Sequence, residues 1–400
     1  MKHLILIITF CTLFLGANAQ DSIELDGMKF DLKELKHYKP YVADSTMLKK
    51  LPKLKSKGIG NENLELNSLR VYSSKEKKSF AKSTYYTKDK NGFDLLSDST
   101  SLKFFDEKGK LKWEKTMKGK SVSNCFLSPD GKKCIIELID YLSDEPADEN
   151  RRLLIFDENG ETLLEHEKWP SINVSNSRDV VCYRSDYRYT GSKADKKTVY
   201  CFDLKTNTGW SKTFENDVVI MPASFNGDYI RIRENETIHN IYTRNGDFIV
   251  KLDYEFLKGR IDQISDDGKY LLVSRSAKHN LPTSFDVYDL STLKYSRTSY
   301  YDVKEDVLDG RIYNGASFVQ NSEYIIALTS IVAPWTGMVI FHDLDGKYLG
   351  HRVYENIKGN FYRPTAILLN DGSLDVYMNG EYFLDNIKLD NVNTLKYLKK

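Results

Sequence analysis

The sequence predicts an all-β fold, a β-propeller of four-stranded blades, because two hairpin patterns alternate along the chain at regular spacing. The first pattern is a short apolar strand, a turn rich in Asn, Asp, Gly and Ser, and a second apolar strand, as in FLSPDGKKCIIE at 126–137. The second pattern is also two strands around a turn, commonly with an aspartate at its start and a glycine near its tip. Together they form a four-stranded unit of about 40 to 54 residues, which is the size of a propeller blade.

Each pattern recurs six times. The first lies at 126–137, 172–185, 221–234, 262–276, 316–330 and 365–380. The second lies at 101–116, 152–167, 198–213, 238–253, 284–299 and 337–352. Its recognisable aspartates are Asp106, Asp157, Asp203, Asp289 and Asp343. A β-sandwich also has many short strands, but it has no reason to repeat at a fixed period.

Seven blades between residues 67 and 391 account for these hairpins most simply. The stretch 67–87 supplies the hairpin that precedes 101–116, and 381–391 pairs with the last hairpin. Six or eight blades remain alternatives. A ring also needs its first and last edges covered, and we expect the stretch 23–32 to be available as a closing strand.

The N-terminus reads as an export signal. A weakly basic start precedes the apolar run 4–15, and Ala17-Asn18-Ala19 forms a small-x-small cleavage site. The cleavage site predicts that the signal is removed near Ala19. We expect no transmembrane anchor, because a membrane-spanning helix needs roughly 20 apolar residues and this run is shorter. The expected organisation is a signal peptide at 1–19, an N-terminal extension at 20–66, the propeller at 67–391 and a tail at 392–400. The mature chain would be periplasmic or extracellular.

The charge balance argues against a nucleic-acid partner. Lys and Arg number 58 and Asp and Glu 57, and no basic stripe stands out. We expect a monomer that binds a protein, peptide or glycan.

Four cysteines follow the signal, and an even number in an exported chain is typical of disulfides. If Pro129 and Asp130 are the two central residues of a tight turn, counting outward places Cys125 opposite Cys134. Cys182 and Cys201 flank one longer hairpin in the same way. The favoured disulfides are therefore 125–134 and 182–201; four free, buried cysteines are the alternative.

SPDGKKCIIE and SDDGKYLLVS, each followed by a strand that ends in FD or YD, resemble the repeats of TolB-type and WD-repeat-like secreted propellers. The resemblance covers about 67–391 and implies the fold. It implies little about function, since such propellers include binding modules and several enzyme classes. The chain lacks the Gly-His and Trp-Asp signatures of true WD repeats, which weakens any transfer of their intracellular scaffold role.

No pattern predicts a metal, a cofactor or a catalytic group. His-Glu-x-x-His, Gly-x-Ser-x-Gly and a glycine-rich phosphate loop are all missing from the sequence. Asp343 and Asp345 begin like a calcium loop, but its terminal glutamate is missing, so we interpret them as part of a blade turn.

The candidate ligand site follows from blade geometry. If the Pro-Asp-Gly turns share one face, the long connections at 141–152, 184–197, 276–284 and 330–338 share the other, where binding loops are usual. Arg260, Arg311 and Arg363 each precede an innermost strand and should lie near the channel mouth on that face, where guanidinium groups suit carboxylate or phosphate. Nearby aromatic residues offer flat surfaces for a sugar or peptide: Tyr313, Tyr362, Tyr187, Tyr189 and Trp335. The alternative is that these arginines pair with blade aspartates and the aromatics pack between loops.

Three functions compete. The first is an exported, non-enzymatic propeller that binds a protein, peptide or glycan on its long-loop face. The second is a glycan hydrolase or lyase with carboxylates or a Tyr/His/Arg cluster on the same face. The third is an envelope assembly scaffold whose arm, residues 20–66, contacts the partner.

Overall fold

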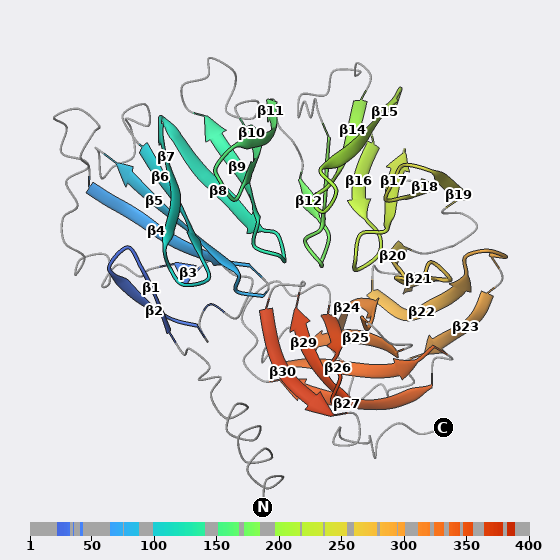
Figure 1. Cartoon of the computed structure of the whole chain (residues 1–400). Coiled ribbons are helices and arrows are strands. Elements are labelled where there is room, and N and C mark those ends of the chain that lie inside the picture. Colours follow the sequence, from blue (N-terminus) through green and yellow to red (C-terminus); the bar gives the residue numbers. More distant parts are fainter. Residues whose placement is uncertain are drawn as a thin grey trace, which may run out of the picture.

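The structure is a computed structural model of the whole chain (Figure 1). It describes residues 22–32, 35, 41–42, 65–74, 76–87, 99–140, 151–167, 172–184, 197–216, 218–234, 237–253, 260–277, 281–293, 295–300, 311–320, 324–331, 336–344, 347–354, 364–378 and 382–388. Within these ranges the regular structure is β-strand, and no helix is long and apolar enough to cross a membrane.

Seven antiparallel sheets follow one another around a central axis, and we number them blades 1 to 7 in chain order (Figure 1). Blade 1 contains β3 (Tyr41–Val42), β4 (Glu65–Ser73), β5 (Ser79–Thr87), β6 (Ser99–Asp106) and β7 (Leu111–Lys118). Blade 2 contains β8 (Lys120–Leu127), β9 (Lys133–Asp140), β10 (Arg151–Asp157) and β11 (Thr162–Glu167). Blade 3 contains β12 (Asn173–Val174), β13 (Val180–Arg184), β14 (Lys197–Asp203) and β15 (Thr208–Phe214).

The later blades repeat this order. Blade 4 contains β16 (Val218–Pro222), β17 (Tyr229–Glu234), β18 (Ile238–Thr243) and β19 (Phe248–Asp253). Blade 5 contains β20 (Arg260–Ile264), β21 (Tyr270–Ala277), β22 (Leu281–Asp289) and β23 (Tyr295–Tyr300). Blade 6 contains β24 (Arg311–Phe318), β25 (Tyr324–Ile331), β26 (Thr336–Asp343) and β27 (Tyr348–Tyr354). Blade 7 contains β28 (Pro364–Leu368), β29 (Ser373–Met378) and β30 (Tyr382–Lys388).

The expected all-β propeller fold is confirmed by this arrangement, in which strands that follow one another in sequence are neighbours in each sheet. The first strands of successive blades contact one another around the axis, for example β20 with β24 and β24 with β28. The number of blades in the complete ring stays a prediction, because blade 7 has three described strands and none of them pairs with blade 1.

The turns between the first two strands of a blade share one serine-centred structure. In blades 1 to 5 the serine hydroxyl accepts a hydrogen bond from the backbone N–H five residues later. The residue three positions after the serine has a positive φ, which glycine adopts most easily. The five serines are Ser74, Ser128, Ser175, Ser224 and Ser265. We call the face that carries these turns the turn face, and the opposite one the long-loop face.

The aspartates of the second pattern cap the turns between the third and fourth strands. One carboxylate oxygen of Asp106 accepts hydrogen bonds from the backbone amides of Lys108 and Lys110. Asp157, Asp203, Asp289 and Asp343 bind amides of their own turns in the same way. The recurring aspartate is thus a structural capping residue.

Hydrophobic clusters join each blade to the next. In the cluster between blades 3 and 4, Val180 and Cys182 of β13 are buried with Ile230 and Ile232 of β17. Equivalent clusters lie at the other junctions from blade 1 to blade 7. The core is therefore divided among the junctions between blades, which holds the inner strands around the axis.

The N-terminal stretch 23–32, a candidate closing strand, forms a two-stranded sheet of its own from β1 (Ser22–Leu25) and β2 (Met28–Asp31). It packs with Leu69, Phe80 and Phe105 on a face of blade 1, in a separate hydrophobic cluster. Asp26 and Gly27 form its tip, both with positive φ, as a two-residue hairpin turn requires. In the described part of the chain, no hydrophobic cluster joins blade 7 to blade 1.

Candidate functional site

Two of the three arginines of the candidate ligand site begin consecutive inner strands, and the third precedes the next inner strand in sequence. Arg260 and Arg311 are the first residues of β20 and β24, and Arg363 directly precedes β28 in sequence. The inner strands run from the long-loop face to the turn face, so their first residues share the long-loop face. The side chains of Arg260 and Arg311 lie outside what the structure describes, as does all of Arg363, and their convergence stays a prediction.

The aromatic candidates are placed less fully. Tyr313 belongs to β24, but its side chain is not among the described parts. Tyr187, Tyr189, Trp335 and Tyr362 lie outside the described residues. Their role in a ligand site therefore stays a prediction.

A cavity of about 280 Å³ lies within the ring, towards the turn face. Its wall comes from the inner strands or first turns of five consecutive blades, 3 to 7. Asn173, Asp262, Gln263, Ser317 and Thr365 supply much of its polar lining. The sequence did not single out these residues, because each is an ordinary polar residue in its own blade.

Several polar side chains of this wall also link neighbouring blades. The amide nitrogen of Asn173 donates to the Ile220 carbonyl at 2.9 Å. Gln263 Oε1 accepts from the Phe318 backbone N–H at 2.7 Å. These hydrogen bonds fix the wall, so the cavity is largely pre-formed.

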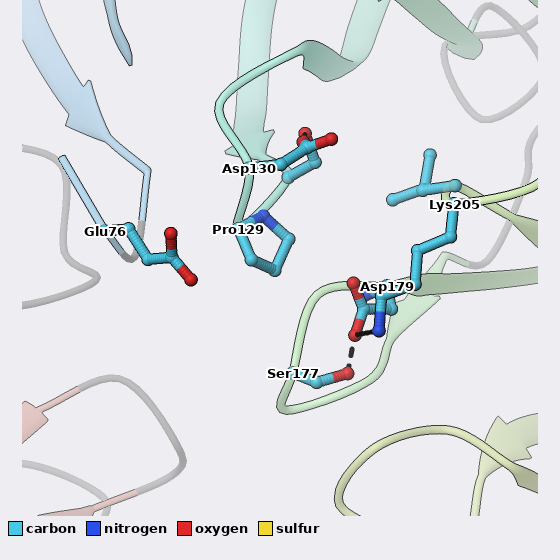
Figure 2. Close-up of a pocket in the computed structure, with 8 residues that line it drawn as sticks. Glu76, Pro129, Asp130, Ser177, Asp179 and Lys205 are labelled. Carbon is cyan, nitrogen blue, oxygen red and sulfur yellow. Dashed lines mark hydrogen bonds and ion pairs between the residues drawn. The ribbon is translucent and has the colours of Figure 1, made fainter. Parts of the chain in front are cut away.

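A second cavity of about 310 Å³ opens on the turn face between blades 1, 2 and 3 (Figure 2). Glu76, Pro129, Asp130 and Asp179 line it from three neighbouring turns. Lys205 Nζ lies 2.9 Å from Asp179 Oδ2 and offsets one of the three carboxylates. Burial would raise the pKa of Asp130, but hydrogen bonds from Ser128 Oγ and the Lys132 amide outweigh this effect and lower it.

The sequence assigned the turn face no site, yet both cavities described here lie on its side of the ring. The repeated turns could have indicated this, since they bring small polar residues of blades 1 to 5 to one face of the ring. In the described ranges no group of three or more His, Cys, Asp or Glu side chains is arranged to hold a metal ion.

Each cysteine lies close to its expected partner, but the prediction that Cys125 is directly opposite Cys134 is wrong. Cys182 is directly opposite Cys201, and their sulfur atoms are 3.8 Å apart. Cys134 is opposite Leu127, two residues after Cys125 on the same strand. The register differs because the Ser128 amide donates a hydrogen bond to the Lys133 carbonyl across a four-residue loop, where a two-residue turn was expected. A shift of two residues keeps both side chains on one face of the sheet, so their sulfur atoms are still 3.7 Å apart.

All four cysteines are buried free thiols in the structure. Their sulfur separations exceed the bonded distance of about 2.05 Å. The two disulfides stay a prediction.

No protein-family model matches the chain, and no curated protein sequence matches it. Solved structures do match. The C-terminal WD40 domain of Sif2 is 12% identical with a TM-score of 0.41, covering 80% of each chain. The β-propeller domain of the Trilobed protease from Pyrococcus furiosus is 11% identical with a TM-score of 0.40, covering 84% of this chain and 98% of that one. A eukaryotic initiation factor is 12% identical with a TM-score of 0.42, covering 81% and 87%.

The chain is a β-propeller, and its resemblance to WD-repeat-like domains is a resemblance of fold. That assignment depends on its own sheet order and on the clusters between its blades.

Proposed function

We propose that this chain is an exported, non-enzymatic binding protein that recognises an anionic group of a protein, peptide or glycan at the long-loop mouth of its channel. Arg260, Arg311 and Arg363 would hold that group. Tyr313, Tyr362, Tyr187, Tyr189 and Trp335 would contact the remainder of the ligand.

The observation that supports the proposal is the place of the three arginines along the chain, at or just before the starts of three inner strands. Arg260 and Arg311 begin the inner strands of adjacent blades, and Arg363 precedes the next inner strand. β24 contacts both β20 and β28, so the three strand starts belong to neighbouring parts of one mouth. Guanidinium groups bind carboxylates and phosphates in bidentate geometry, which makes an anion the natural ligand.

The packed blades support a binding role on this face. The second strands of blades 2, 3, 5 and 6 end there, and their third strands begin there. Variable loops on a rigid scaffold are a common basis for recognition.

The test is a screen of acidic glycans and of peptides that carry carboxylate or phosphate groups, followed by titration of each hit against Arg260→Gln and Arg311→Gln. We expect each substitution to weaken binding at least about tenfold, as for one charge-assisted hydrogen bond. Lys112→Gln, on an exposed position of β7, is the control and should bind like the parent protein.

Two results would contradict the proposal. Hits whose affinity does not change in either arginine variant would place the ligand elsewhere. Mass spectra that show a hit cleaved after incubation would favour a glycan hydrolase or lyase.

A further inference from the structure

The cavity inside the ring extends towards the turn face from a level close to the proposed anion site, since Asp262 and Thr365 of its wall each lie two residues after an arginine of that site, Arg260 or Arg363. Ser175 and Ser224, which belong to the first turns of blades 3 and 4, contribute to its wall. Arg260 and Arg311 begin their strands at the other mouth. Its volume of about 280 Å³ is near the lower end of the range for small-molecule sites.

The wall of this cavity combines hydroxyl, amide and carboxylate groups with a small apolar area. Asp262, Gln263, Ser317 and Thr365 face it from β20, β24 and β28, while Met221 and Pro222 of β16 supply apolar surface. A few fixed polar groups beside apolar surface are the usual composition of a small-ligand pocket.

Thr365 provides an independent sign of unused binding capacity. The residue is 3% exposed, and Oγ1 has no hydrogen-bond partner among the described residues. Buried hydroxyl groups are nearly always paired, because leaving one unpaired costs free energy. A ligand in the cavity would supply the missing partner after a small rotation of this side chain.

The charge of the wall limits the class of ligand. Asp262 is the one charged residue among the lining residues that the structure describes, and it is 6% exposed. Its carboxylate accepts hydrogen bonds from Ser274 Oγ and from the Ala316 amide, which hold it in place. An anion would meet this carboxylate at low dielectric and be disfavoured. A wholly apolar molecule would leave the polar wall unpaired.

We propose that the turn-side end of the channel binds a small, uncharged, hydroxyl-rich molecule of monosaccharide size. The hydroxyl of Thr365 and the polar groups of Ser317 and Gln263 bind its hydroxyls, and Met221 and Pro222 contact its carbon face.

The probe is glucose, compared with glucuronate, which has the same ring and an added carboxylate. Titration is followed by ligand-observed NMR with the full mature chain. We expect saturable glucose binding, and at least about tenfold weaker binding of glucuronate when it competes with glucose, which reports on this site alone. Thr365→Val should weaken glucose binding about fivefold, the value of one hydrogen bond. Since it removes an unpaired hydroxyl, Thr365→Val should melt no lower than the parent.

One control and a second variant of the wall complete the test. Thr116→Val, on an exposed position of β7, should bind glucose like the parent. Ser317→Ala provides a second variant of the wall and should also weaken binding.

The proposal is overturned if glucose shows no saturable binding, which would mean that the cavity holds water only. It is equally overturned if Thr365→Val and Ser317→Ala both bind glucose like the parent, or if Thr116→Val weakens binding as much as they do. None of these results bears on anionic ligands at the long-loop mouth.

Discussion

Replacing Asp26 with asparagine should loosen the N-terminal hairpin from blade 1. Asp26 Oδ2 lies 2.9 Å from Lys82 Nζ and 2.8 Å from Lys103 Nζ. The Lys82 side chain is 2% exposed, so little water reaches its ammonium group and the Asp26 carboxylate stabilises its charge. Asparagine tolerates the positive φ of this position, so the substitution changes charge with little backbone strain.

The expected loss is about 2 kcal/mol of unfolding free energy. Breaking a fully buried ion pair costs about 3 to 5 kcal/mol, since the remaining charge is left without its partner. Asp26 is 35% exposed, so water screens part of the interaction, and the amide oxygen still accepts one hydrogen bond. Both effects reduce the loss.

The pH dependence has a definite sign. Burial alone would raise the pKa of Asp26, but the hydrogen bonds from Lys103 and Lys82 outweigh it and lower the pKa. A lowered carboxylate pKa stabilises the fold above the unfolded value of about 3.9, and this contribution is lost as the pH falls through the folded value. The difference between parent and variant should therefore shrink in acid.

The assay is urea denaturation at neutral pH together with hydrogen exchange of the amides of 22–32. Glu24→Gln is the matched control, because it removes one negative charge from an exposed position of the same hairpin. If Asp26→Asn and Glu24→Gln lose the same stability and exchange at the same rate, the ion-pair reasoning is wrong.

Four further outcomes are expected. Arg244→Met should lower the unfolding free energy by about 2 kcal/mol, because the Arg244 guanidinium lies 2.5 Å from the mostly buried Asp203 carboxylate. Burial alone would raise the pKa of Asp203, but the hydrogen bond from Arg244 helps to lower it, so the loss should become smaller in acid. Gly131→Ala should destabilise the fold more than Gly27→Ala, although both glycines have positive φ. A Cβ at position 131 would lie 2.7 Å from Lys78 Cβ, whereas a Cβ at position 27 would have no heavy atom of another residue within 4 Å, its chain neighbours aside. Reduction should add about four hydrogens to the intact mass if both disulfides form. Sequencing of the secreted chain should begin at Gln20.

Each outcome has a contradicting result. Lys269→Met removes a highly exposed ion pair with Asp267, so an equal loss in this variant and in Arg244→Met would refute the burial argument. Equal melting of the two glycine variants would refute the steric argument. An unchanged mass would show free thiols. A secreted chain that still begins at Met1 would refute cleavage.

The fold was largely predictable because its signals are local and repeated. The alternation of apolar residues, the polar turns and the capping aspartates recur in most blades, so each copy supports the others. Exact register was harder. A Pro-Asp-Gly sequence suits a two-residue turn as well as the four-residue loop that the Ser128 hydroxyl and the positive φ of Gly131 stabilise.

The candidate sites were predictable only in part, since a propeller assembles its channel from residues far apart in sequence. The arginines were recognisable because their charge is conspicuous next to a strand start. Thr365 and Ser317 carry no such signal, and their common cavity follows only from the closing of blades 3 to 7 around one axis. The Asp-Gly pair within 23–32 is a hairpin signal that the prediction of one closing strand did not use, and nothing in that stretch indicates the surface that the hairpin will cover.

The most direct test of the central claim is diffraction from crystals soaked in selenate, an anomalously scattering oxyanion. The account predicts an anomalous peak at the long-loop mouth, with the guanidinium groups of Arg260, Arg311 and Arg363 around it. A mouth without a peak, in which the three arginines form separate ion pairs with blade carboxylates, would contradict it.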